Sequence, residues 1–327
     1  MDGTLDNILE IKNLHVHYVT EDSEIKAVNG VNLAIKKGDS LGLVGETGAG
    51  KTTTALSIIQ LIPDPPGIIV EGEILFNGKN LIHNTEKENK QLRGNGISMI
   101  FQDSMTALNP IMRVGDQLAE VVITHTKVSK AEAKRQVIDL LETVGVKADR
   151  YNDYPHQFSG GMKQRVLITM ALLCNPELLI ADEPTTALDV TIQAQVLELI
   201  KQLRKKYNMS MILISHDLGV VAETCDRVAI IYAGEIVEIG TVEEVYTNPK
   251  HPYTRGLFES IPKLEEDQSR LFQIEGTMAS PASLPKGCYF HPRCKYKADI
   301  CETISPGMQG EEHLSKCHFS LRDEVLA

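Results

Sequence analysis

The 327-residue chain lacks an apolar run long enough to cross a bilayer, and it lacks an excess of basic residues. Its longest nearly unbroken apolar stretch, from Val166 to Cys174, is far shorter than the roughly 20 residues that a membrane-spanning helix needs. The net charge is −11, and Lys and Arg are dispersed along the chain, which argues against a nucleic-acid partner. The first residues also lack the basic and apolar segments of an export signal. We therefore expect a cytoplasmic protein that reaches a membrane only by docking on a membrane protein.

Length and composition are those of a globular protein with more than one part. Hydrophobic residues make up 42% and charged residues 24% of the chain, which is ordinary for a protein with a packed core. Its 327 residues exceed one compact domain of usual size, so we expect one large domain with an appendage. Beyond about Pro249 the regular pattern fades into sequence that carries Pro, Gly and Cys, and there we expect a separate small region.

Strand-like and helix-like patterns alternate along the rest of the chain, without an internal repeat. Apolar residues alternate over residues 8–43, and short apolar runs at 178–181, 211–214 and 228–232 predict further strands. A helical pattern covers about residues 103–173. This alternation predicts an α/β fold with a mainly parallel sheet and a helical insertion.

The sequence also predicts where three helices begin or end. One runs from Thr52 to Ile62 and stops before a run of prolines. A second follows Ser129 and Glu132, which have the spacing of a capping box. A third begins at Asp189. The inward-facing residues are predicted to be Ala133, Val137, Leu140, Leu141 and Val144 in the second helix, and Val196, Leu199, Ile200 and Leu203 in the third.

A glycine-rich segment lies between a short buried strand at residues 41–44 and the helix that starts at Thr52. It consists of Gly45, Glu46, Thr47, Gly48, Ala49, Gly50, Lys51 and Thr52, and Thr53 follows it. In a P-loop the glycines let backbone amides point at phosphates, the lysine reaches the terminal phosphates, and the next hydroxyl is offered to Mg²⁺. Strand, glycine-rich loop and helix in this order predict a nucleotide site. Upstream, Tyr18 either stacks on adenine or packs in the core of its strand.

Two carboxylates follow the buried run at residues 178–181. Asp182 is placed to hold Mg²⁺, usually through water, and Glu183 to polarise an attacking water molecule. A pair of solvated acids at the end of a strand is the alternative, but Pro184 and the sequence at residues 187–189 argue against it.

Other polar residues stand where helices begin or strands end. Ser159, Gly160 and Gly161 begin a helix whose amides form an anion site, and we expect this site to serve the nucleotide of another subunit. His216 follows a strand and is predicted to contact the γ-phosphate or to orient the water. Gln102 ends another strand and is predicted to ligate Mg²⁺ or the water.

Four of the six cysteines lie in the last 40 residues of the sequence. They are Cys288, Cys294, Cys301 and Cys317, separated by five, six and fifteen residues. In a cytoplasmic chain this clustering indicates a metal or redox site rather than disulfides, although the spacing is neither that of zinc ribbons nor that of common ferredoxins. The open alternatives are a [4Fe–4S] cluster, Zn²⁺ with help from His291 or His318, and no metal. Cys174 and Cys225 are predicted to be buried structural thiols.

Taken together and in this order, the motifs resemble those of the ATP-binding-cassette transporter ATPases over about residues 8–250. The resemblance implies a P-loop NTPase (RecA-like) core with an antiparallel β subdomain. It implies a nucleotide-binding domain over residues 1–255, with a helical subdomain at about 103–173. A small C-terminal region with the four-cysteine site is expected over residues 256–327.

The same resemblance implies a role for each motif. It identifies residues 45–52 as Walker A, Asp182 as the Walker B aspartate and Glu183 as the catalytic glutamate. By the same resemblance the signature consists of Ser159, Gly160 and Gly161, and the D-loop of Ala187, Leu188 and Asp189. Gln102 matches the Q-loop, His216 the switch histidine and Tyr18 the adenine-stacking aromatic. Two subunits would close around two ATPs, with Ser159, Gly160, Gly161 and Asp189 contacting the opposite subunit's ATP. Mg²⁺ would be held by Thr52, Gln102 and Asp182. The signature departs from the family at Phe158 and Met162, which replace leucine and glutamine.

Three segments carry a narrower resemblance, to the oligopeptide/dipeptide importer ATPases: residues 101–110, 248–257 and 287–294. It implies ATP-driven uptake of di- or oligopeptides, with nickel and oligosaccharides as alternative substrates. The implied partners are a second, non-identical ATPase subunit, two transmembrane permease subunits and an extracytoplasmic solute-binding protein. The chain would lie on the cytoplasmic face of the membrane. Similar ATPases are associated with a [4Fe–4S] cluster, which favours that cluster over Zn²⁺ at the four cysteines.

Two other functions remain open from the sequence. Cassette ATPases that move no solute usually carry two cassettes or basic surfaces, whereas this chain has one cassette and an acidic excess. A redox sensor would require ATPase activity to change with the oxidation state of the cluster.

Overall fold

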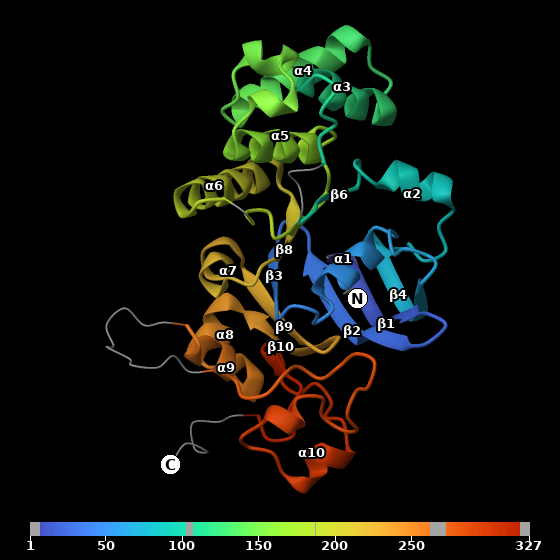
Figure 1. Cartoon of the computed structure of the whole chain (residues 1–327), viewed down its shortest axis with the longest axis vertical. Helices are drawn as coiled ribbons and strands as arrows, with labels where there is room; N and C mark the ends of the chain where they lie inside the picture. Colours follow the sequence, from blue (N-terminus) through green and yellow to red (C-terminus); the bar gives the residue numbers. More distant parts are fainter. Residues whose placement is uncertain (1–6, 103–106, 187, 262–272, 321–327) are drawn as a thin grey trace, which may run out of the picture. The chain divides into compact units, whose positions relative to one another are not determined.

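The computed structural model describes residues 7–102, 107–186, 188–261 and 273–320 (Figure 1). The chain divides into two compact units. The first unit comprises Met1–Ile8, Ile35–Ser40 and Phe76–Ile214, and the second comprises Leu9–Ala34, Leu41–Leu75 and Ser215–Ala327. Within the described ranges, no helix is both long enough and apolar enough to span a bilayer.

Three parallel strands form the centre of the first unit: β6 (Ile97–Ile100), β7 (Leu178–Asp182) and β8 (Ser210–Ile214). Ile97 pairs with Leu178, and Leu178 with Ser210. Strands β7 and β8 are buried along their whole length, as expected of parallel strands that are covered on both faces. Parallel strands bring their carboxyl ends to one edge of the sheet. The residues after β6 and β7 therefore share an edge.

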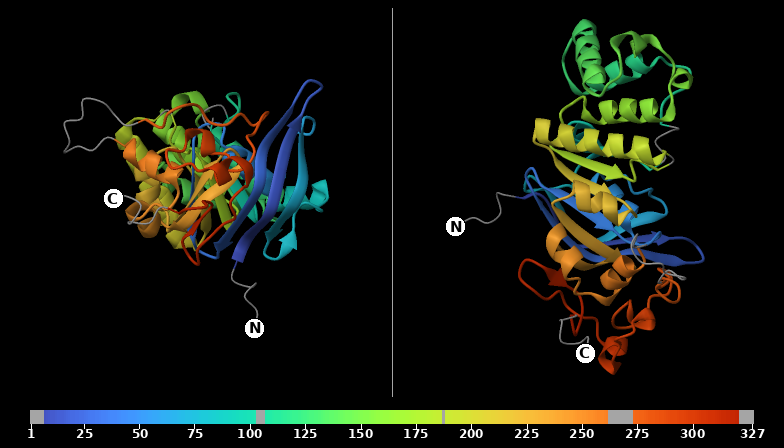
Figure 2. Two further views of the ribbon diagram at one scale, coloured as in Figure 1. Left: turned by 90° about the horizontal axis from the view of Figure 1, so that it is seen from below. Right: turned by 90° about the vertical axis from the view of Figure 1, so that its left-hand side faces the viewer.

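Helices make up most of the rest of the first unit. They are α2 (Glu86–Leu92), α3 (Val114–His125), α4 (Lys130–Thr143), α5 (Gly160–Leu172) and α6 (Val190–Tyr207), with a short strand β5 (Lys79–Asn80) before them. Helices α3, α4 and α5 contact one another, and α5 also contacts α6 (Figures 1 and 2). The predicted helical insertion is thus present.

The capping box predicted for α4 forms only in part. The Ser129 hydroxyl accepts from the amide of Glu132 at 3.2 Å, but the Glu132 carboxylate bonds to Arg135 and Gln136 instead of returning to the cap. The predicted inner face of α4 is buried as expected. In α6 the prediction was wrong at one position, because Leu197 is buried and Leu199 only half-buried.

The second unit contains two groups of strands. One is the sheet of β2 (Glu24–Lys36), β1 (Asn7–Val19) and β4 (Gly67–Phe76), in this order, with the long β1 and β2 coloured blue in Figure 2. In the other, β3 (Ser40–Val44) runs parallel to β9 (Arg227–Tyr232). Strand β9 is antiparallel to β10 (Glu235–Thr241), which in turn is antiparallel to β11 (Leu314–Ser315). Helices of this unit are α1 (Lys51–Ile58), α7 (Leu218–Thr224), α8 (Val242–Thr247), α9 (Pro252–Glu259) and α10 (Asp299–Thr303).

Helix α1 ends four residues earlier than predicted. Gln60 adopts a left-handed conformation with φ of 53°, and the amide of Leu61 donates to the carbonyl of Leu56 at 2.9 Å. This pattern closes a helix before a proline can do so. The sequence prediction depended on Pro63 and missed the turn at Gln60.

The segment beyond Pro249 joins the second unit through a buried carboxylate. Glu238, on β10, is fully buried and accepts from His313 Nε2 at 2.6 Å and from the amides of Lys250 and His251 at 2.7 and 2.8 Å. Strand β11 adds to β10 beside these bonds. The expected boundary between residues 255 and 256 remains a prediction, because neither compact unit begins or ends there.

Candidate functional site

The glycine-rich loop of the second unit connects β3 to α1, as predicted. Gly48 and Gly50 have φ of 82° and 101°, and no side chain caps the N-terminus of α1. Lys51 is only 7% exposed, and its ammonium donates to the carbonyl oxygens of Gly45 and Glu46 at 2.7 and 3.0 Å. Uncapped helix amides and an adjacent lysine form a phosphate site.

Two of the loop glycines are required by their surroundings. A Cβ at Gly45 would collide with the carbonyl of Ile231 on β9, and one at Gly50 would collide with the carbonyl of Ala27 on β2. Only glycine combines this close approach with the left-handed conformation of Gly50. The loop is therefore seated between two strands of its own unit.

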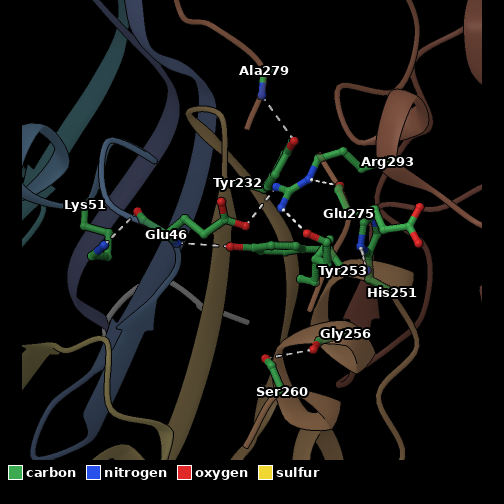
Figure 3. A network of polar contacts seen from close by, with 11 residues as sticks. Glu46, Lys51, Tyr232, His251, Tyr253, Gly256, Ser260, Glu275, Ala279 and Arg293 are labelled. Atoms are coloured by element: carbon green, nitrogen blue, oxygen red, sulfur yellow. Dashed lines mark hydrogen bonds and ion pairs between the residues drawn. The ribbon is translucent and has the colours of Figure 1, made fainter. Parts of the chain in front are cut away.

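Glu46, the second residue of the loop, is held by two residues from the far end of the sequence (Figure 3). Its amide donates to the hydroxyl of Tyr253 at 3.0 Å, and its carboxylate pairs with Arg293 at 2.9 Å. Sequence reasoning assigned no role to Tyr253 or Arg293. Both lie within segments that carry the narrower resemblance, but a local pattern does not reveal where a side chain points.

The second unit also contains the predicted nucleotide contacts Tyr18, Thr52 and His216. The Tyr18 hydroxyl lies 3.4 Å from the hydroxyl of Thr53 on α1, and its side chain is half-buried. Thr52 and His216 are exposed, and Asp217 caps α7 by accepting from the amides of Gly219 and Val220. The roles of Tyr18 and His216 remain predictions.

The carboxylates lie in the first unit, at the carboxyl edge of its strands. Asp182 ends β7 and is 1% exposed. Glu183 has φ of 45°, an uncommon conformation for a residue with a side chain, and its amide donates to Ile214 at 2.9 Å. Gln102 Nε2 and the Thr186 hydroxyl donate to Glu183 Oε2 at 3.0 and 3.1 Å.

This arrangement brings two predicted residues together and adds a third. Gln102 and Glu183 meet because β6 and β7 are parallel neighbours. Thr186 was not predicted, although its position three residues after Glu183 is a spacing that lets a side chain reach back. Backbone strain of the kind seen at Glu183 tends to concentrate at functional sites.

The predicted signature forms the N-terminus of α5. The Ser159 hydroxyl accepts from the amide of Met162 at 3.4 Å. A Cβ on Gly161 would lie 2.7 Å from Ile192 on α6, so this glycine permits close packing of the two helices. Asp189 caps α6 by accepting from Ile192 N at 3.0 Å. Ala187 lies outside the described residues, and the contacts of Ser159, Gly160, Gly161 and Asp189 with another subunit's nucleotide remain predictions.

The four C-terminal cysteines line one cavity of about 440 Å³, together with His291 and His318. Burial raises the pKa of Cys288 and of Cys294 to about 11, and it also raises the pKa of Cys317. Across the described residues, however, no three or more His, Cys, Asp or Glu side chains are grouped closely enough to hold a metal ion.

Each of the two histidines of this cavity places one ring nitrogen near a backbone carbonyl. His291 Nδ1 lies 2.9 Å from the carbonyl oxygen of Cys288, and His318 Nε2 lies 2.8 Å from that of Ile304. Histidines that ligate metals commonly bond a carbonyl through their other ring nitrogen, so the expected Zn²⁺ alternative stays a prediction. Cys225 is buried, as predicted, whereas Cys174 is only half-buried.

Two family models match the chain. The model of the ABC transporter family matches residues 28–186, and that of the oligopeptide/dipeptide transporter C-terminal region matches residues 237–301.

Curated relatives match nearly the whole chain. The dipeptide transport ATP-binding protein DppD of Bacillus subtilis (strain 168) is 47% identical over 96% of this chain and 95% of its own length. The oligopeptide transport ATP-binding protein OppD of the same organism is 53% identical over 92% of this chain and 85% of its own length. OppD of Salmonella typhimurium is 46% identical over 91% of this chain and 89% of its own length.

Solved structures agree with the cassette fold. The ATP-binding cassette MJ0796, as a dimer in a post-hydrolysis state with ADP and Pi, superposes with a TM-score of 0.64 and 26% identity, covering 72% of this chain and 98% of its own. A component of the cbiONQ ABC transporter complex, cbiO1 from Clostridium perfringens, also has a TM-score of 0.64, at 26% identity, covering 74% and 91%.

Proposed function

Since this chain belongs to the ABC transporter family and carries the oligopeptide/dipeptide transporter C-terminal region, we propose that it hydrolyses ATP to drive the uptake of di- or oligopeptides. Membership makes it a cassette ATPase with a P-loop fold. The observation that carries the proposal is Glu183, which has a strained backbone and a carboxylate that accepts from Gln102 and Thr186, in a chain that also forms a P-loop.

Each residue has a part in the proposed hydrolysis. The amides at the start of α1 and the Lys51 ammonium bind the phosphates, and Glu183 polarises the attacking water while His216 contacts the γ-phosphate. Gln102 orients the Glu183 carboxylate, as its 3.0 Å hydrogen bond indicates. Mg²⁺, held by Thr52, Asp182 and Gln102, would supply positive charge to the phosphate oxygens. Such catalysis depends on positioning and electrostatics.

The proposed assembly contains more than this chain. A second ATPase subunit that is not identical to it would receive Ser159, Gly160, Gly161 and Asp189 at its ATP. Two transmembrane permease subunits and an extracytoplasmic solute-binding protein complete the importer, with this chain on the cytoplasmic face of the membrane. Relatives named for dipeptide and oligopeptide transport favour peptides over nickel or oligosaccharides as the substrate.

We also propose that the cysteine cavity holds a [4Fe–4S] cluster. All four cysteines line one cavity, whose volume of about 440 Å³ is larger than a single ion needs. Thiolates are soft ligands that suit iron–sulfur clusters.

Glu183→Gln tests the proposed ATPase mechanism. We expect the variant to bind ATP and to stabilise the closed dimer with its partner subunit, while hydrolysis falls at least about 100-fold, as loss of a general base does. Glu177→Gln is the matched control, because Glu177 precedes the same strand and contacts only Asn77 among the side-chain bonds described for it. Undiminished phosphate release by Glu183→Gln would remove Glu183 from the mechanism.

A further inference from the structure

We propose that Arg293 and Tyr253 are positioning residues of the nucleotide site, which fix the P-loop through Glu46. This inference rests on the proposed ATP binding. It makes the C-terminal region a working part of the nucleotide site and not an appendage to it.

Glu46 is held at two points, one on its side chain and one on its backbone (Figure 3). Arg293 Nη1 donates to Glu46 Oε1 at 2.9 Å, with side chains 6% and 31% exposed. The Glu46 amide donates to the hydroxyl of Tyr253, a residue that is fully buried. A half-buried carboxylate paired with a buried guanidinium is little screened by solvent, unlike an ion pair at the surface.

Arg293 is itself rigidly placed. Its Nε donates to the carbonyl of Glu275 at 3.0 Å, and its guanidinium lies 5.8 Å from the ring centroid of Tyr232. Burial alone would lower the pKa of Arg293, but hydrogen bonds to Tyr232 and Glu46 outweigh it and raise that pKa. The cation is therefore permanent and matched to the Glu46 carboxylate.

Tyr253 is fixed by a cluster of buried rings. Its ring centroid lies 4.7 Å from that of Tyr232 and 5.4 Å from that of Phe290. Burial raises the pKa of Tyr253, so its hydroxyl stays neutral. Phe290 also lines the cysteine cavity, and Arg293 stands next to Cys294 in the sequence.

Residues 278–281 also lie near the glycine-rich loop. A Cβ on Gly48 would be 3.4 Å from the terminal methyl of Met278, and the amide of Lys26 donates to Pro281 O at 2.9 Å. The amide of Ala279 donates to the Tyr232 hydroxyl at 3.3 Å. Residues 278–281 thus follow the same side of the second unit as the loop.

Fixing Glu46 affects phosphate binding directly, because the backbone of Glu46 also bonds the side chain of Lys51. The Lys51 ammonium donates to the Glu46 carbonyl at 3.0 Å. With Arg293 removed, a loop containing two left-handed glycines has more conformations to lose when a nucleotide binds. Nucleotide affinity falls, although none of these tail residues is among those assigned to the phosphates.

The test is the affinity of the full-length chain for a fluorescent ADP, compared among variants with equal thermal stability. Arg293→Ala is expected to bind about tenfold more weakly, within the range of coupling between distinct sites. Arg293→Lys should recover part of the loss, since it restores the charge but not the planar fork. Glu46→Gln should weaken binding similarly, and the double variant should be no weaker than either single variant.

Lys297→Ala is the matched control, because the Lys297–Glu302 pair lies in the same region with both side chains 50% exposed. Its ADP affinity should equal that of the unaltered chain. Affinities of Arg293→Ala and Glu46→Gln that equal that of the unaltered chain, or strictly additive losses in the double variant, would overturn the proposal. If Arg293→Ala does not fold, the ADP affinities of Glu46→Gln and Tyr253→Phe decide whether the proposal holds. Failure of the unaltered chain to bind ADP would instead contradict the proposed ATP binding.

Discussion

At the scale of single residues, the charge of Lys51 distinguishes the P-loop from an ordinary glycine turn. Lys51 is 7% exposed, and its ammonium donates to the carbonyl oxygens of Gly45 and Glu46. In a P-loop the lysine ammonium also reaches the terminal phosphates of the nucleotide, so nucleotide binding depends on this side chain.

Lys51→Ala should therefore abolish tight nucleotide binding. We expect affinity for a fluorescent ATP to fall at least about 100-fold, since hydrogen bonds between charged groups contribute about 1.5–3 kcal/mol each. Lys37→Ala, at an exposed lysine before β3, should leave the affinity as it is. Unchanged binding by the Lys51 variant would contradict the P-loop assignment.

Among the elements, α9 begins with a histidine that works as a cap only when neutral. His251 Nδ1 accepts from the amide of Tyr253 at 3.1 Å, and His251 is 1% exposed. Burial lowers the pKa of His251 to about 4, although Glu238 raises it somewhat and Lys316 lowers it further. Protonation would remove the acceptor that begins α9.

Folding stability should consequently fall on acidification between about pH 6.5 and pH 4. Below pH 6.5 the unfolded chain binds a proton at His251 that the folded chain excludes, so the unfolded state gains stability. The loss attributable to this group is about 2 kcal/mol from pH 7 to pH 5. His251→Asn keeps a capping acceptor without the titration, so its urea unfolding curves should shift less between these two pH values. An equal shift in both proteins would contradict this role.

The elements also show what local sequence patterns can predict. Periodicity predicted the strand–loop–helix that begins at residue 41, and it placed both Gln102 and Glu183 at strand ends. That the two side chains meet follows from the parallel pairing of β6 with β7, which the sequence did not reveal. Local patterns could not place the end of α1, which depends on a left-handed Gln60. They could not predict the bonds from Glu46 to Tyr253 and Arg293, since those pairs are 207 and 247 residues apart.

At the scale of the whole molecule, the group bound in the cysteine cavity determines whether this ATPase is also an iron–sulfur protein. Protein purified without oxygen should be brown and contain about four irons and four sulfides per chain. Cys301→Ser should lower the iron content, because Cys301 lines the cavity. Cys174→Ser, at a half-buried thiol in the other unit, should leave it unchanged. One zinc per chain without sulfide would refute the cluster and leave the cassette ATPase intact.

The distance along the chain between Glu46 and Arg293 also sets an order of events during synthesis. The two residues are 247 positions apart. At roughly 5–20 residues per second, the ribosome adds Arg293 about 12–50 s after Glu46. On our proposal, a nascent chain that already contains the whole P-loop still binds cellular ATP weakly. Tight ATP binding then begins only when the part of the chain that contains Arg293 has been made and folded. Bound ATP is thus a property of subunits whose C-terminal region is in place.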